Sequence, residues 1–144
     1  MAEKKKLRLK VVTPTKTTLD TAADMVIMQA IDGELGVMPN HEPLATVLTN
    51  GTLRYYDDEK IGYIALFGGL AEISKTEVVV LADIAESPED IDAARAALAE
   101  ERARRHLAEK KADLDEQRAK TALRKALVRQ ELTGKLTMEP RDKK

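Results

Sequence analysis

Apolar and polar residues alternate in short runs over the first 86 positions, which is the pattern of half-buried β-strands. Residues 7–12 (LRLKVV) place an apolar side chain at every second position, and Pro14 ends the run. Residues 24–30 (DMVIMQA) form a second β-rich run, which stops at the turn-forming residues 31–33 (IDG).

Two β-hairpins are expected further along. Residues 51–67 predict two strands around a polar turn at 57–59, and residues 70–82 predict two more around a turn at 74–77. Between the hairpins, residues 68–69 (GG) predict a β-bulge or a close approach of two backbones. Short strands at this spacing, with no helical period between them, indicate an antiparallel β-sandwich or barrel.

The pattern changes to helix at Ser87. This residue suits an N-cap, Pro88 suits the first helical position, and acids follow in the first turn. A second start pattern lies at Asp113, where Glu116 stands three residues after the cap, as in a capping box. We therefore expect an antiparallel helical hairpin that turns within residues 106–113. No Gly or Pro enforces the break, so a hairpin and an extended rod differ by about a few kcal/mol, the condition for a bistable element.

Charge divides the chain at the same place. Residues 1–86 carry 9 Lys and Arg against 13 Asp and Glu, a net charge of −4, whereas residues 87–144 carry 15 against 12, a net charge of +3. We predict an α+β fold class with two domains: an N-terminal antiparallel β-sandwich over residues 1–86, followed by a C-terminal two-helix antiparallel hairpin over residues 87–144.

The sequence offers little for catalysis. It has no Cys, which excludes disulfides, thiolate metal sites and a Cys nucleophile. His41 and His106 lie in different predicted parts, and residues 33–36 (GELG) lack the Gly-Lys-Ser/Thr ending of a phosphate-binding loop. We expect no catalytic residue and no metal site. No run approaches the roughly 20 apolar residues of a membrane span, and no signal-peptide pattern is present, so we expect a soluble cytoplasmic protein.

A run of cations marks the second predicted helix. Residues 118–129 contain five Lys and Arg and no anion, and Arg118, Lys125 and Arg129 share one helical face. Either this face is simply solvated, or it meets an anionic partner: an acidic protein surface, nucleotide phosphates or nucleic acid. Nucleic acid is the weaker choice, because the overall pI is about 6.2 and the helix has no aromatic side chain to stack on bases.

Three stretches together resemble one family, the epsilon subunits of bacterial F-type ATP synthase. Residues 33–44 (GELGVMPNHEPL) are similar to its glycine-rich Pro-x-His-x-Pro-Leu loop. Residues 67–73 (FGGLAEI) and 78–83 (VVVLAD) resemble its Gly-Gly strand pair, and residues 91–96 (IDAARA) resemble its nucleotide motif. The order and spacing match from near the N-terminus to about Leu136.

The resemblance implies a non-catalytic central-stalk subunit that couples rotation between the c-ring and the catalytic head during proton-driven ATP synthesis. It implies a sandwich packed against the gamma subunit and a hairpin that extends toward the catalytic alpha and beta subunits to inhibit ATP hydrolysis. The protein would then be peripheral on the cytoplasmic face of the bacterial inner membrane, with membrane contact only through the complex and no nucleic-acid partner. Glu34 and His41 match the part of the loop that faces the c-ring, although ordinary turn chemistry explains them too.

The same resemblance implies a regulatory ATP site and no other cofactor. Ile91, Asp92, Arg95 and Ala96 match the nucleotide motif, although Asp92 and Arg95 could simply pair with each other within one helix. Arg129 matches a phosphate-binding arginine of the family, but the preceding arginine is replaced by Lys125, which lacks a bidentate fork.

Contact with the catalytic head would fall on four cations of the second helix: Arg118, Arg124, Lys125 and Arg129. Two other kinds of protein stay open. A free-standing nucleotide-sensing module would remain monomeric, and a helical nucleic-acid binder would show a steep salt dependence of binding. An enzyme is the last choice, for want of a site.

Overall fold

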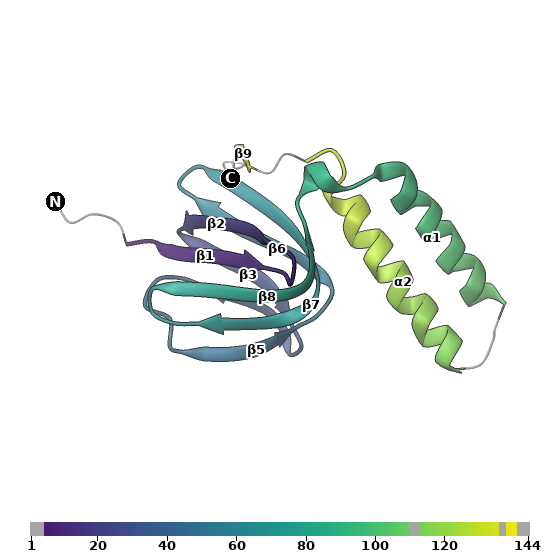
Figure 1. Ribbon diagram of the computed structural model, residues 1–144, viewed down its shortest axis with the longest axis horizontal. Coiled ribbons are helices and arrows are strands. Elements are labelled where there is room, and N and C mark those ends of the chain that lie inside the picture. The colour runs from purple at the N-terminus through teal and green to yellow at the C-terminus, as the bar shows by residue number, and fades with distance from the viewer. Residues whose placement is uncertain (1–4, 110–112, 136–137, 141–144) are drawn as a thin grey trace.

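The computed structural model describes residues 5–109, 113–135 and 138–140 and places a β-sandwich beside two antiparallel helices (Figure 1). The elements are β1 Leu7–Val12, β2 Thr17–Ala23, β3 Met25–Ala30, β4 Gly33–Val37, β5 Leu44–Leu48, β6 Gly51–Asp57, β7 Lys60–Ile73, β8 Glu77–Glu86, a one-turn 3-10 helix η1 at Pro88–Asp90, α1 Ala93–Ala108, α2 Asp113–Leu132 and β9 Met138–Pro140. The predicted α+β class, with a sandwich first and helices after it, is confirmed.

Alternation along β1 places its apolar side chains in the core. Leu7, Leu9 and Val11 are almost fully buried, whereas Arg8 between them is exposed. The same core takes Leu53 and Tyr55 from β6 and Val78 and Val80 from β8, among others. Since the chain has a single Phe and no Trp, aliphatic side chains fill most of this interior.

The long strand β7 belongs to both layers of the sandwich. Its first half pairs with β6, and its second half pairs with β5, while β8 runs along much of the other edge. The switch occurs at Gly68 and Gly69, which have φ of +76° and +144°. A Cβ on Gly69 would lie 2.5 Å from the carbonyl oxygen of Leu81, so the predicted close approach of two backbones is confirmed.

Both predicted hairpins are present, although residues 60–73 form one continuous strand and not two. Pairing is antiparallel throughout the described ladders except between β1 and β8, which lie far apart in sequence and run parallel. The sequence patterns missed β2, β5 and β9. They also treated residues 33–44 as a loop, whereas residues 33–37 form β4, which pairs with β3 from Ala30↔Gly33 to Val26↔Val37.

The first long helix begins later than predicted. Ser87 precedes η1 only, and the chain is extended at Ile91 and Asp92 before α1 starts at Ala93. The true N-cap of α1 is Asp92, whose carboxylate accepts a hydrogen bond from the backbone amide of Arg95 at 3.1 Å. β8 ends at Glu86, at the predicted junction, but the division into two independent domains remains a prediction.

The two helices pack antiparallel with small residues between them. Ala96 and Ala103 of α1 and Ala119 and Ala126 of α2 are buried, and alanine lets helices approach closely. Their described ends, Ala108 and Asp113, agree with a turn within residues 106–113, of which residues 110–112 lie outside the described structure. No described helix is long and apolar enough to cross a bilayer.

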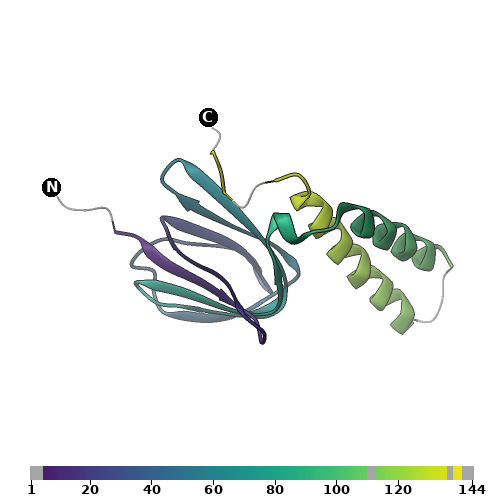
Figure 2. The same ribbon diagram turned by 45° about the horizontal axis from the view of Figure 1, so that its top comes forward.

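The hairpin meets the sandwich near the C-terminal end of α2, and its other end projects away (Figures 1 and 2). Val128 and Leu132 of α2 bury their side chains against Ala65 and Phe67 of β7, all at most 3% exposed. Two aliphatic side chains buried in this way contribute roughly 1.5–3 kcal/mol each. The contact therefore holds the hairpin with a free energy of about a few kcal/mol.

Candidate functional site

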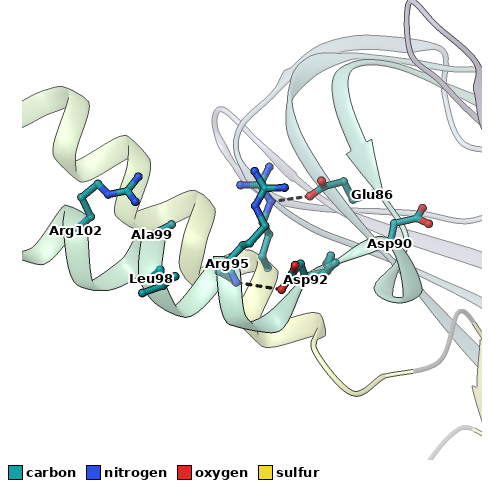
Figure 3. Close-up of a pocket in the computed structure, with 10 residues that line it drawn as sticks. Glu86, Asp90, Asp92, Arg95, Leu98, Ala99 and Arg102 are labelled. Atoms are coloured by element: carbon teal, nitrogen blue, oxygen red, sulfur yellow. Dashed lines mark hydrogen bonds and ion pairs between the residues drawn. The ribbon is translucent and has the colours of Figure 1, made fainter.

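A pocket of about 420 Å³ lies where β8, α1 and α2 meet (Figure 3). Its charged lining consists of three acids and three arginines: Glu86, Asp90, Asp92, Arg95, Arg102 and Arg129. Its apolar lining is Ile91, Ala96, Leu98 and Ala99. The volume falls in the range of small-molecule sites, and the mixture of arginines with a small apolar wall suits a ligand that is part anionic and part flat and apolar.

The start of α1 brings the predicted motif to this pocket. The N-cap at Asp92 fixes the direction of the first helical turn, so Arg95 and Ala96 line the pocket together with Ile91 and Asp92. Asp92 accepts its hydrogen bond from the backbone amide of Arg95, which makes this contact a helix cap; the side-chain pair between the two residues was the alternative explanation of the motif. All four motif residues therefore share one cavity.

Arg129 enters the pocket from α2 and is held on two sides. Its Nε donates to Oε1 of Glu86 at 2.7 Å, and its guanidinium lies 4.5 Å from the centre of the Phe67 ring. Both partners of the ion pair are less than one-third exposed. Any anionic ligand in the pocket would share Arg129 with the carboxylate of Glu86.

Sequence patterns missed Glu86, Asp90 and Arg102 as lining residues. Arg102 could have been found, because it stands seven residues after Arg95 and therefore on the same helical face. Glu86 ends a strand, and no periodic pattern links it to the helices. Lys125, which replaces the second family arginine, does not line this pocket.

A polar contact between the helices adjoins the pocket. Gln130 of α2 donates through Nε2 to Glu100 at 2.6 Å, and Arg104 donates through Nε to the same side chain at 2.7 Å. The hydrogen bond from Arg104, followed by that from Gln130, holds the pKa of Glu100 below its ordinary value of 4.5. An ionised carboxylate thus ties α1 to α2.

Two further cations of the predicted run, Arg124 and Arg118, lie in different surroundings. Arg124 donates from Nε to the backbone oxygen of Asn50 at 3.4 Å, at the edge of the sandwich. Arg118 lines a second space between the helices with Arg102 and His106. Arg118 and Arg129, two of the three cations of the predicted face, thus line separate pockets that share Arg102, whereas Lys125, the third, lines neither of them. Arg124 lies on the sandwich side.

Glu34 and His41 occupy different elements. Glu34 lies on β4, where its Oε2 accepts from Gln29 at 3.2 Å and from Arg54 at 3.4 Å. His41 lies in the loop before β5, with Nδ1 2.7 Å from the Glu42 backbone oxygen. That loop is tied to the β7–β8 turn by a hydrogen bond from the Asn40 amide to the Lys75 oxygen at 2.8 Å.

One group of acids in the described structure has the spacing of a cation site. Carboxylate oxygens of Asp24, Asp57 and Asp58 lie within 4.8 Å of one another. The ammonium of Lys6 contacts all three, closest to Asp57. The hydrogen bond to Asp57 is the main cause that raises the pKa of Lys6. Lys6 therefore supplies the positive charge at this position.

A row of apolar side chains crosses the outer face of the sheet. Val47 of β5, Leu70 of β7, Leu81 of β8 and Val12 of β1 are in direct register across four adjacent strands. Val47 is 49% exposed and Leu81 is 45% exposed. Four aligned apolar residues on an exposed sheet face form a surface suited to another protein. We call these four residues the apolar row.

Comparison with protein families identifies the sandwich. Residues 6–88 match the model for "ATP synthase, Delta/Epsilon chain, beta-sandwich domain". The chain is 41% identical to the ATP synthase epsilon chain of Symbiobacterium thermophilum over 131 residues, which cover 90% of this chain and 94% of that one. It is 43% identical to the epsilon chain of Desulforamulus reducens over 122 residues, covering 85% and 92%.

Solved structures share the fold. A chain in the mitochondrial ATP synthase of Euglena gracilis, described as the OSCP/F1/c-ring part of that enzyme, superposes with a TM-score of 0.74 at 22% identity, covering 85% of this chain and 78% of that one. A chain in the central stalk and c-ring of the Tetrahymena thermophila enzyme superposes with a TM-score of 0.59 at 14% identity, covering 92% and 99%.

Proposed function

This chain belongs to the ATP synthase epsilon chain family, and we propose that it works as a non-catalytic rotor subunit that couples rotation and restrains ATP hydrolysis. In this role the sandwich joins the gamma subunit and the c-ring, and the helical hairpin regulates the catalytic alpha and beta subunits. The protein would act on the cytoplasmic face of the bacterial inner membrane, peripheral to it and held there by the complex during proton-driven ATP synthesis.

The observation that carries the regulatory part is the small contact between hairpin and sandwich. Val128 and Leu132 contribute a few kcal/mol against β7, and Arg129 adds one ion pair. A contact of this size is reversible, so an alternative partner that offers more can draw the hairpin out. The alternative partner would be the catalytic head. Its acidic surfaces would bind the cations of α2: Arg118, Arg124, Lys125 and Arg129.

The apolar row supports the structural part of the proposal. A rotor subunit has to bind its neighbour through rotation under load, which calls for buried apolar area in addition to polar contacts. Val47, Leu70, Leu81 and Val12 offer such area on a rigid sheet. We assign this face to the gamma subunit, and Glu34 and His41 to the polar loops of the c-ring.

Regulatory ATP fits the pocket at the base of the hairpin. Arg95, Arg102 and Arg129 can face the phosphates, and the wall of Ile91, Ala96 and Ala99 can face the base. Because the pocket takes residues from both α1 and α2, bound ATP would stabilise the folded hairpin. Glu86 competes for Arg129 and Lys125 lies elsewhere, so we expect modest affinity.

The test is co-purification with the other head and stalk subunits, followed by an ATPase assay with and without residues 87–144. We expect the sandwich alone to assemble and the assembled enzyme to hydrolyse ATP faster without the hairpin. A protein that stays monomeric in the presence of gamma would instead be a free-standing nucleotide sensor. Unchanged hydrolysis after removal of the hairpin would contradict the regulatory role.

A further inference from the structure

The described residues from Arg129 onward contact β7 at positions that run in the opposite direction along that strand. Arg129 lies over Phe67, Leu132 packs against the cluster at Ala65, and the ammonium of Lys135 lies 4.7 Å from the centre of the Tyr63 ring. Strand β9 then pairs antiparallel with the start of β7, from Gly62↔Met138 to Lys60↔Pro140. One strand therefore contacts the end of α2, Lys135 and the last described strand.

A glycine turns the chain toward β7 at the end of α2. The last turn closes with hydrogen bonds from the Thr133 amide to the Arg129 oxygen and from the Lys135 amide to the Leu132 oxygen. Gly134 follows the cap with φ of +86°, a conformation that other residues adopt at a cost. A Cβ on Gly134 would meet no atom within 4 Å, so the conformation alone calls for glycine here.

The strand that β9 covers would otherwise have an open edge. Residues 60–62 pair with β6 on one side, but β8 reaches β7 only from Ala65 onward. An unpaired edge exposes backbone donors and acceptors, and β9 satisfies it. Pro140 has no amide hydrogen and so suits the end of such an edge strand.

From this arrangement we propose that β9 is a clasp that holds the helical hairpin against the sandwich. The five residues 133–137 join Leu132 to Met138 and reach at most about 20 Å when fully extended. The end of α2 therefore cannot move farther than this from β7 while β9 stays paired. Release of three residues of strand comes before extension of a helix of 20 residues.

The clasp would act in the isolated protein, independently of the proposed role in the ATP synthase. If that role holds as well, the clasp sets how readily the hairpin leaves the folded state. The experiment accordingly uses the purified full chain with neither nucleotide nor other subunits, so that its outcome does not depend on assembly.

A buried thiol reports the opening, because the chain has no native Cys. Val128→Cys places a reporter under α2 at a position that is fully buried, and Val80→Cys places one in the sandwich core at an equally buried position. The rate of labelling by a thiol reagent is compared between the full chain and a chain that ends at Lys135. Glu139→Pro removes the central amide of β9 without shortening the chain, and Glu139→Ala is its matched control.

We expect the Val128→Cys reporter to react about five- to thirtyfold faster after truncation or Glu139→Pro. This factor corresponds to a loss of about 1–2 kcal/mol of stability of the closed state. Gly134→Ala should act in the same direction, whereas Gly36→Ala, where a Cβ also has open space but φ is ordinary, should not. The Val80→Cys reporter should keep its rate. Equal rates at Val128→Cys in all variants would overturn the clasp, and so would a matching rise at Val80→Cys, which would mean that β9 supports the sandwich and does not hold the hairpin.

Discussion

Arg129 of α2 and Glu86 of β8 form an ion pair with 2.7 Å between Nε and Oε1, and this pair joins the helical hairpin to the end of the sandwich. The two residues are 43 positions apart in the chain. The same guanidinium lies over the ring of Phe67, 4.5 Å from its centre. The pair belongs at once to the wall of the pocket and to the docking contact of α2.

Arg129→Ala should therefore loosen the hairpin. A charge-assisted hydrogen bond and a cation–π contact at a site that is partly exposed together contribute about 1–2 kcal/mol. Amide hydrogen exchange over α2 measures the loss, and a cycle with Glu86→Ala isolates the pair. Arg105→Ala, which removes an exposed pair with Glu101 on α1, is the control and should cost less than about 0.5 kcal/mol. If Arg129→Ala and Arg105→Ala change hydrogen exchange over α2 equally, the contact between Arg129 and Glu86 does not stabilise the hairpin.

Arg95→Ala and Arg102→Ala should each weaken ATP binding by about tenfold or more, the factor for one charge-assisted contact with a phosphate. Titration calorimetry of the purified chain measures the affinity. Arg105 lies on the same helix outside the pocket lining, so Arg105→Ala should leave the affinity unchanged. If all three variants bind ATP equally, the pocket is not a nucleotide site.

The hairpin should lose a stabilising contact in acid. The pKa of Glu100 is lowered in the folded state by Arg104 and Gln130, so its carboxylate contributes stability above pH 4.5 that is lost as the pH falls through the lowered folded-state pKa. Glu100→Gln removes the titration. The difference in unfolding free energy between the original chain and this variant, measured by denaturant at about pH 3 to 7, should shrink toward the acid end. A difference that grows in acid would give the wrong sign for a lowered pKa.

Val47→Glu and Leu81→Glu should abolish co-purification with the gamma subunit. Each places a charge within the apolar row, where association would bury it without a partner. Both positions are more than 40% exposed, so the isolated protein should remain folded, which circular dichroism checks. Ala22→Glu, at an exposed position on β2, is the control. Normal assembly of both row variants would place gamma on another face.

Cysteines at Glu34 and His41 should cross-link to the polar loops of the c-subunits in membranes. The original chain gives no background, since it has no Cys. The two positions lie on β4 and on the loop that follows it, so links from both would place this side of the sandwich on the ring. Links to the catalytic head alone would put these residues at the other end of the rotor.

Local patterns determined much of this architecture from sequence. Alternation in β1 reflects a side-chain period of two, which any strand with one buried face must show. The polar residues 57–59 predicted the turn between β6 and β7. The family resemblance, and no local pattern, implied a common site for Ile91, Asp92, Arg95, Ala96 and Arg129, and these five residues line one pocket. The turn between the helices was predicted from charges and caps, and the described helix ends agree with it.

Tertiary contacts decided the rest. The short strands β4 and β5 carry glycine or exposed apolar residues, so their sequences resemble loops, and pairing with β3 and β7 makes them strands. Ser87 and Asp92 both suit an N-cap, and the extended backbone at Ile91 decides for Asp92. Glu86 meets Arg129, and β9 meets β7, across long stretches of chain. No local period encodes such contacts, because they depend on where the folded elements place residues that are distant in sequence.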